Sequence, residues 1–88
     1  MGMRVFLQQP PAPGVPPRFC QLTLQGDLLG GYVLLREVGE VGGRSQLRRS
    51  VHLDRDSAVA AFEDARDREI KRGLRITFAE GTQPTQAA

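Results

Sequence analysis

The chain contains no tryptophan, one cysteine and one histidine, and its aromatic residues are four Phe and one Tyr. A single cysteine excludes an internal disulfide, and Cys20 and His52 alone cannot build a Cys/His metal site. No apolar run is long enough to span a membrane, and the N-terminus lacks the apolar core of a signal peptide. These absences favour a reducing, cytoplasmic location and predict neither a cofactor nor a membrane partner.

Positive charge exceeds negative charge only slightly, with 12 Lys+Arg against 10 Asp+Glu and a formal net charge of +2. So small an excess does not by itself indicate a nucleic-acid partner. All but one of the basic residues are arginine, which suits bidentate contacts with phosphate or carboxylate but also follows from GC-rich codon usage. With 88 residues, 40% of them hydrophobic, the chain has material for one small globular core.

Alternation of apolar and polar residues predicts an antiparallel sheet. The expected strands are residues 3–7, at a sheet edge, residues 18–25, the run between the glycine pairs 30–31 and 42–43, and residues 44–53. Residues 74–78 form either a fifth strand or a cover over the end of a helix. Leu47, Val51 and Leu53 share one face of their segment. The proline-rich stretch 10–17 predicts an extended linker, with a ligand for an SH3-like domain as the alternative.

A helix is predicted to start at Asp54, whose carboxylate suits the N-cap, and to end at Gly73. Its expected buried stripe consists of Ala58, Val59, Phe62, Ala65 and Ile70, and its other side is a solvated face of alternating charges, which includes Glu69. The predicted fold class is therefore α+β, an antiparallel sheet of four to five strands with one amphipathic helix packed on one face. Residues 1–78 form the single domain, and residues 79–88 form a flexible C-terminal tail.

The central run carries a recognisable motif, and its residues are Tyr32, Leu35, Arg36, Glu37, Val38, Gly39, Glu40, Val41 and Gly42. This order resembles the WGR domain, which is named for a Trp-Gly-Arg tripeptide and occurs in DNA-dependent poly(ADP-ribose) polymerases and in many bacterial proteins. Here Val38 stands in place of the tryptophan and Glu40 in place of the arginine. The resemblance extends over residues 18–73 and implies the same layout of sheet and helix. Independently of it, Gly39 predicts a bulge or a close approach of another chain segment.

The resemblance implies a binding module for DNA breaks, in which the motif tryptophan stacks near the duplex end and the motif arginine makes polar contacts beside it. Val38 offers no aromatic face for stacking, and the Glu40 carboxylate repels phosphate. Basic side chains remain within and after the motif, and they are Arg36, Arg44, Arg48 and Arg49. Four phosphate contacts predict a slope of log affinity against log salt of about −3.6, which is weak binding. Alternation predicts that Arg49 lies on the other face from Arg36 and Arg48.

Two functions therefore stay open. The first is weak binding of nucleic acid, either DNA backbone or DNA ends, by the candidate residues Arg36, Val38, Gly39, Glu40, Arg44, Arg48 and Arg49. The second is a protein-interaction or structural module that has lost DNA binding, with Val38 and Val41 as an apolar docking spot and Glu37 and Glu40 selecting a basic partner. A basic rim around Gly39 would favour nucleic acid, and an acidic or apolar rim would favour protein.

Catalysis is not expected, and no catalytic residue and no small-molecule substrate are predicted. Cys20 falls in the buried row of its strand, which favours a core residue over a nucleophile. His52 lies on a polar face without a partner in sequence and is expected to be an exposed bystander. No glycine-rich loop enters a helix as a phosphate cradle would, and nothing in the sequence indicates a raised pKa at Glu37 or Glu40.

Overall fold

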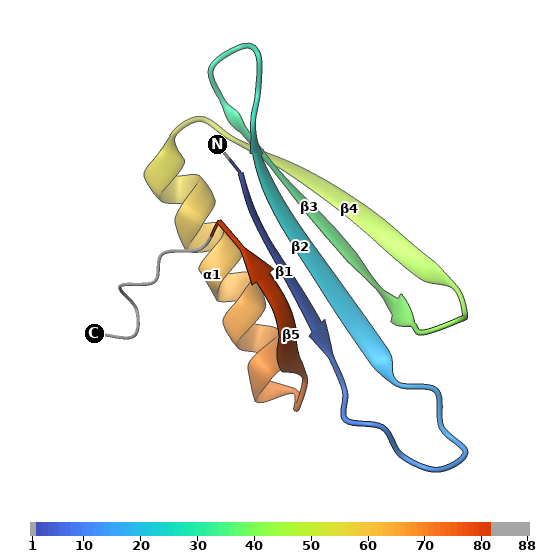
Figure 1. Cartoon of the computed structure of the whole chain (residues 1–88). Helices are drawn as coiled ribbons and strands as arrows, with labels where there is room; N and C mark the ends of the chain where they lie inside the picture. The colour runs from blue at the N-terminus through green and yellow to red at the C-terminus, as the bar shows by residue number, and fades with distance from the viewer. Residues whose placement is uncertain (1, 82–88) are drawn as a thin grey trace.

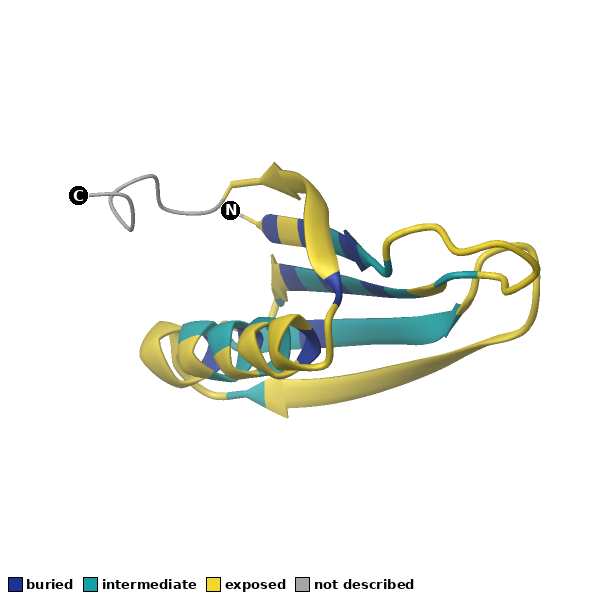
Figure 2. Cartoon of the chain, turned by 90° about the horizontal axis from the view of Figure 1, so that it is seen from below, coloured by how far each residue is buried: buried dark blue, intermediate teal, exposed yellow. Residues whose placement is uncertain are grey.

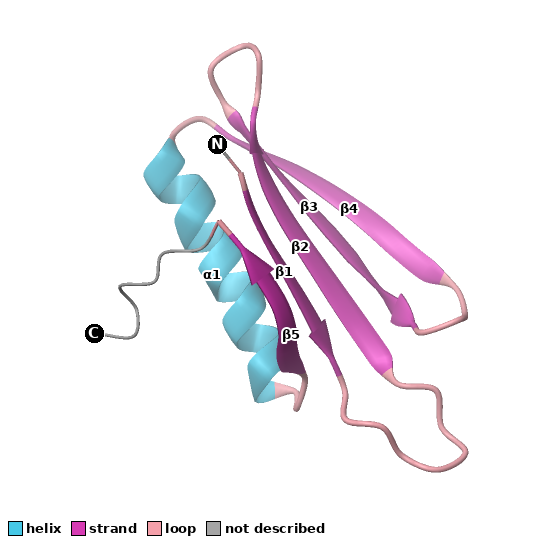
Figure 3. Ribbon diagram, in the orientation of Figure 1, coloured by secondary structure: helices cyan, strands magenta, loops and turns pink. Residues whose placement is uncertain are grey.

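The computed structural model describes residues 2–81, which form five strands and one helix (Figure 3). In chain order these are β1 (Met3–Gln8), β2 (Arg18–Gly26), β3 (Tyr32–Glu40), β4 (Ser45–His52), α1 (Arg55–Lys71) and β5 (Arg75–Glu80). All neighbouring strands are antiparallel, in the spatial order β4-β3-β2-β1-β5 (Figure 1). The helix packs against one face of this sheet, so the predicted α+β fold is confirmed.

Strand β5 corrects two expectations from the sequence. It pairs with β1, so β1 lies inside the sheet between β2 and β5 and is not the edge strand that was expected. It also runs to Glu80, so Ala79 and Glu80 belong to the sheet and not to the predicted tail. The rest of that tail, from residue 82 onward, lies outside the described residues. Pairing over such a sequence separation is decided by the whole fold, which is why alternation alone did not reveal it.

The core lies between α1 and the middle strands. Its largest fully buried side chains are Val5 and Leu7 of β1, Cys20 and Leu22 of β2, and Phe62 of α1. They follow the period of two expected for strands with one buried face. Figure 2 shows this burial on β1 and β2, whereas β4 and β5 are exposed along almost their whole length. Burial of each such side chain contributes about 1.5–3 kcal/mol.

Helix α1 begins and ends at the residues that the sequence indicated. The Asp54 carboxylate accepts a hydrogen bond of 2.7 Å from the Ser57 backbone N–H, and this bond holds the pKa of Asp54 below its usual value. At the other end Gly73 has φ +96°, a left-handed conformation that suits glycine. The Leu74 N–H then donates to the Glu69 carbonyl at 3.0 Å, and the side chain of Leu74 enters the core.

The buried face of α1 differs from the prediction near its C-terminal end. Ile70, which was expected in the core, is 44% exposed, whereas Glu69, which was assigned to the solvated face, is 4% exposed. Ala58, Phe62 and Glu69 are four and seven residues apart, so they lie on one line along the helix, and Ile70 lies a further 100° around it. The helix therefore directs a carboxylate, not an isoleucine, toward the sheet.

We call the side of the sheet that packs on α1 the helix face and the other side the open face. Register places Leu47 and Val51 of β4 on the open face, together with Val33 of β3. Leu47 is 66% exposed and Val51 is 53% exposed, so the apolar side of β4 faces away from the core. Leu53, beyond the end of β4, is 89% exposed. Within residues 2–81 no element covers the open face.

Candidate nucleic-acid interface

The β3–β4 turn depends on the glycine of the altered motif. A Cβ at Gly39 would overlap the backbone oxygen of Arg44 and come within 2.7 Å of the Ser45 Cα. The Glu40 N–H donates to that Arg44 oxygen at 3.2 Å, and the Val41 N–H donates to the Pro17 oxygen at 2.9 Å. The segment that comes close to Gly39, as the sequence predicted, is therefore the start of β4. The hydrogen bond from Val41 to Pro17 also links the proline-rich loop to the β3–β4 turn.

The structure separates the predicted site residues into three groups. Arg36, Val38, Glu40 and Arg48 lie on the helix face, Arg49 lies on the open face, and Gly39, near the end of β3, and Arg44 lie where β3 turns into β4. Arg48 is the Cα partner of Arg36, and Arg49 is the partner of Leu35. The predicted division of the arginines by strand alternation is thus confirmed, and Arg49 cannot contact the same ligand surface as Arg48.

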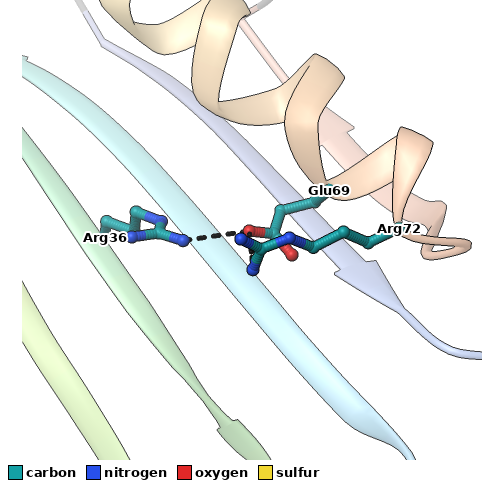
Figure 4. Close-up of polar contacts among 3 residues, drawn as sticks. All are labelled: Arg36, Glu69 and Arg72. Carbon is teal, nitrogen blue, oxygen red and sulfur yellow. Dashed lines mark hydrogen bonds and ion pairs between the residues drawn. The ribbon is translucent and has the colours of Figure 1, made fainter.

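Arg36 is engaged inside the protein. Its Nη2 donates to Glu69 Oε2 at 3.0 Å, and Arg72 Nη1 lies 3.7 Å from the same oxygen (Figure 4). The Glu69 side chain is 6% exposed and that of Arg36 is 28% exposed. A carboxylate at this depth requires a cationic partner, and Arg36 supplies it from the sheet while Arg72 adds a longer contact from the helix end. Arg36 therefore serves the helix–sheet contact and offers little to an external phosphate.

The same carboxylate influences the single cysteine. Burial raises the pKa of the Cys20 thiol to about 11, and the nearby negative charge of Glu69 adds to the rise. The cations of Arg36 and Arg72 act in the opposite direction but do not offset burial. A thiol with this pKa is almost entirely protonated at neutral pH, so the chemistry of Cys20 is that of a core residue.

A depression of about 510 Å³ opens beside the motif on the helix face. Its lining consists of Arg18, Val38, Gly39, Glu40, Arg44, Ser45 and Gln46. Arg18 and Arg44 supply two positive charges against the single negative charge of Glu40, and both arginines are exposed. Arg48 follows Gln46 on the same face of β4. The rim around Gly39 is therefore basic on balance, and we call Arg18, Arg44 and Arg48 the basic rim.

Two arginines close to the predicted site residues were not identified as candidates from the sequence. Arg18 is the Cα partner of Glu40, and strand pairing brings it to the motif from the start of β2. Arg72, just past the end of α1, contacts Glu69 and so lies near Arg36, but it does not line the depression. A count of residues back from the β2–β3 turn would have placed Arg18 opposite Glu40, because a hairpin fixes register. Nothing local to the sequence indicates the position of Arg72.

Val38 and Val41 do not form the common apolar spot considered above. Val38 packs against the core and lines the depression, whereas Val41 lies in the turn and is absent from that lining. Glu37 points to the open face and accepts a hydrogen bond from Ser45 Oγ at 2.7 Å. The two carboxylates of the motif therefore lie on opposite sides of the sheet and present no joint acidic surface.

Fold and surface together define a small α+β domain with a basic depression at one end of its sheet. No known protein family, curated protein or solved structure matches this chain. Among residues 2–81, no three side chains of His, Cys, Asp or Glu gather closely enough to hold a metal ion. In the same range, no helix has both the length and the apolar character needed to cross a membrane.

Proposed function

We propose that this protein is a non-catalytic binding module, similar to a WGR domain, that binds the nucleic-acid backbone weakly through the basic rim. The observation that supports the proposal is that Arg18 and Arg44 line one depression and that Arg48 follows its lining residue Gln46 on the same face of β4. Guanidinium groups spaced along a surface contact phosphate oxygens without reading bases. The ligand is therefore a duplex backbone or a duplex end, bound without sequence preference.

The number of available arginines sets the expected strength. Arg49 faces away and Arg36 is paired with Glu69, so Arg18 replaces them and three phosphate contacts remain. Three contacts predict a slope of log affinity against log salt of about −2.7. The Glu40 carboxylate in the same rim reduces affinity further by repelling phosphate. Binding is accordingly strong only at low ionic strength.

The altered motif explains the weakness in structural terms. Val38 lines the depression, so a larger ring at this position has space to enter it from the sheet. A stacking aromatic contributes about 1–3 kcal/mol per base, and Val38 forgoes that contribution. Restoring both motif residues, as Val38→Trp with Glu40→Arg, adds the ring and changes the rim charge by two units in the favourable direction.

An NMR titration with a short 5′-phosphorylated DNA duplex tests the proposal at low and at near-physiological salt. We expect salt-sensitive shifts at Arg18, Arg44 and Arg48, and an affinity at least about tenfold higher for Val38→Trp with Glu40→Arg. The matched control is Leu53→Trp with Asp64→Arg, which adds a ring and the same charge change at exposed positions outside the depression. The control variant should gain much less affinity for the duplex than the variant with the restored motif.

The proposal fails if the wild-type spectrum is silent at both salts, or if the control gains as much affinity as the restored motif. The first result would favour a protein partner for this surface, the alternative that the sequence leaves open. The second would show that added charge alone explains the gain, and that Val38 and Glu40 do not occupy the positions implied by the WGR resemblance.

A further inference from the structure

We propose that the open face of the sheet binds a second copy of this chain, face to face, about a two-fold axis that runs along β2. The apolar side chains of this face fall into two halves. The half formed by β1, β2 and β5 carries the aromatic side chains Phe6, Phe19 and Phe78. The half formed by β3 and β4 carries the aliphatic side chains Val33, Leu35, Leu47 and Val51. A sheet face to which every strand contributes an apolar side chain is stabilised by a second layer.

The aromatic half is already ordered for packing. The rings of Phe6 and Phe19 stack with centroids 5.6 Å apart and an interplanar angle of 8°. The Arg4 guanidinium lies over the Phe78 ring, 5.3 Å from its centroid, and also pairs with Glu80 at 3.0 Å. These contacts restrict the rotamers of the aromatic side chains, which lowers the entropy lost when a partner covers them.

The charges of the open face fit a copy of the chain better than they fit a polyanion. Register places Arg4, Arg49 and Arg75 on this face together with Glu37 and Glu80. Three positive charges against two negative ones leave an excess of one, and Arg4 is paired with Glu80. Nucleic-acid surfaces need a larger excess of positive charge, whereas a self-complementary interface needs both signs.

The chosen axis follows from the strand order. Because β2 is the middle strand of β4-β3-β2-β1-β5, a two-fold axis along it lays β4 of one copy over β5 of the other. One row across the open face runs from Arg49 through Thr23 to Glu80, so Arg49 then meets Glu80 of the second copy. In the next row Leu47 meets Phe78 of the second copy. Away from the axis, Leu47 over Phe78 is the one apolar pair that the described strands form, because Leu35 lies over Arg4 and Glu37 lies over Phe6 of the second copy.

The edge strands offer a poorer route to self-association. A two-fold antiparallel pairing of two β4 strands keeps each face on its own side, so a register centred near the strand midpoint places Arg48 opposite Arg48, or Arg49 opposite Arg49, of the other copy. Like charges in opposed positions destabilise such a pair. The β1–β5 ladder shifts register between Phe6 and Leu7, and irregularity of this kind protects a sheet edge. Contact through the face avoids both obstacles.

The area of the face is sufficient. Five strands about 4.8 Å apart, with six to nine residues at about 3.3 Å each, cover roughly 600 Å². Specific interfaces begin at about 600 Å² per partner, and side-chain relief adds to the flat estimate. A dimer of this kind buries Leu47 and Phe78, which are 66% and 47% exposed in the single chain.

Sedimentation equilibrium of the full chain without nucleic acid tests the proposal over protein concentrations from about 1 to 500 µM, the range in which a modest interface of this size associates. We expect a dimer for the wild type and a dissociation constant at least about tenfold higher for Arg49→Glu, which places like charges opposite each other. Arg49→Glu combined with Glu80→Arg should return the constant to within about threefold of the wild-type value. Circular dichroism and a thermal melt of each variant confirm that it is folded.

The control is Arg68→Glu, which makes the same charge change on an exposed helix residue and should leave the association unchanged. A wild type that stays monomeric overturns the proposal, as does a dimer that Arg49→Glu leaves intact or that the double variant fails to restore. Shifts of Phe6 and Phe78 during the DNA titration, with no dimer present, would assign the face to nucleic acid instead. Because sedimentation involves no DNA, its outcome is separate from that of the proposed function.

Discussion

At the scale of single residues, Gly39 has a structural reason to be glycine that is independent of any ligand. The backbone of β4 approaches it so closely that the Ser45 Cα would lie 2.7 Å from an added Cβ. The same turn holds Arg44 at the edge of the depression. Gly39 therefore positions part of the basic rim through backbone geometry.

We expect Gly39→Ala to lower the free energy of unfolding by about 1–3 kcal/mol, because β4 must move away to admit the methyl group. Urea denaturation measures the loss. The matched control is Gly26→Ala, since a Cβ at Gly26 has no atom within 4 Å and its φ is not positive. Equal stability of Gly39→Ala and wild type would show that β4 moves away at no cost in free energy, which would contradict the close packing of Gly39 against Ser45.

The residue scale also shows how far the candidate site was predictable. Alternation correctly separated Arg49 from Arg48, because side-chain direction in a strand is a local property. It did not reveal that Arg36 is paired with Glu69, since that contact joins residues 33 positions apart. Nor did it bring Arg18 to the motif. Of the four predicted arginines, Arg44 and Arg48 belong to the basic rim, whereas Arg36 is paired with Glu69 and Arg49 lies on the open face.

At the scale of elements, the contact between α1 and β3 combines apolar packing with one buried ion pair. Glu69 lies on the same helix line as Ala58 and Phe62, so the face that buries Phe62 also directs a carboxylate into the interface. Arg36 of β3 meets it at 3.0 Å. The pair fixes where the end of α1 rests on the sheet, because a slide of the helix would leave the carboxylate buried without its partner.

Arg36→Met should therefore destabilise the fold by about 1–3 kcal/mol, less than the ~3–5 kcal/mol for a fully buried pair, because Arg36 is partly exposed and Arg72 also reaches Glu69. The control is Arg66→Met, which removes a contact to Asp67, a residue with a side chain 56% exposed, and should change stability by no more than about 0.5 kcal/mol. Thermal and urea melts of both variants provide the comparison. A neutral Arg36→Met would mean that Arg72 alone compensates Glu69.

At the scale of the whole molecule, stability is unevenly distributed over a thin two-layer domain whose principal extents are 45 × 33 × 18 Å. Strands β1 and β2 supply most of the buried side chains, while β4 and β5 are the exposed edges. The face that lies opposite α1 has no second layer within residues 2–81. Local opening is therefore expected to begin at the edges and to reach the centre only on global unfolding.

Native-state hydrogen exchange measures this distribution. We expect the backbone amides of Leu7 and Leu22 to exchange only through global unfolding, and those of Leu47 and Thr77 to exchange faster by at least about tenfold through local opening. Uniform protection across all five strands would contradict this uneven picture.

The sequence by itself determined four of the five strands, the helix with both of its ends, and the buried side of β2. These are local properties, because alternation, capping and glycine conformation depend on residues close together in the chain. Only the tertiary structure decided that β5 closes the sheet beside β1, that Glu69 is buried against Arg36, and that Arg18 joins the motif. Those contacts join distant residues, and their free energy depends on packing and charge pairing that exist only once the chain has folded.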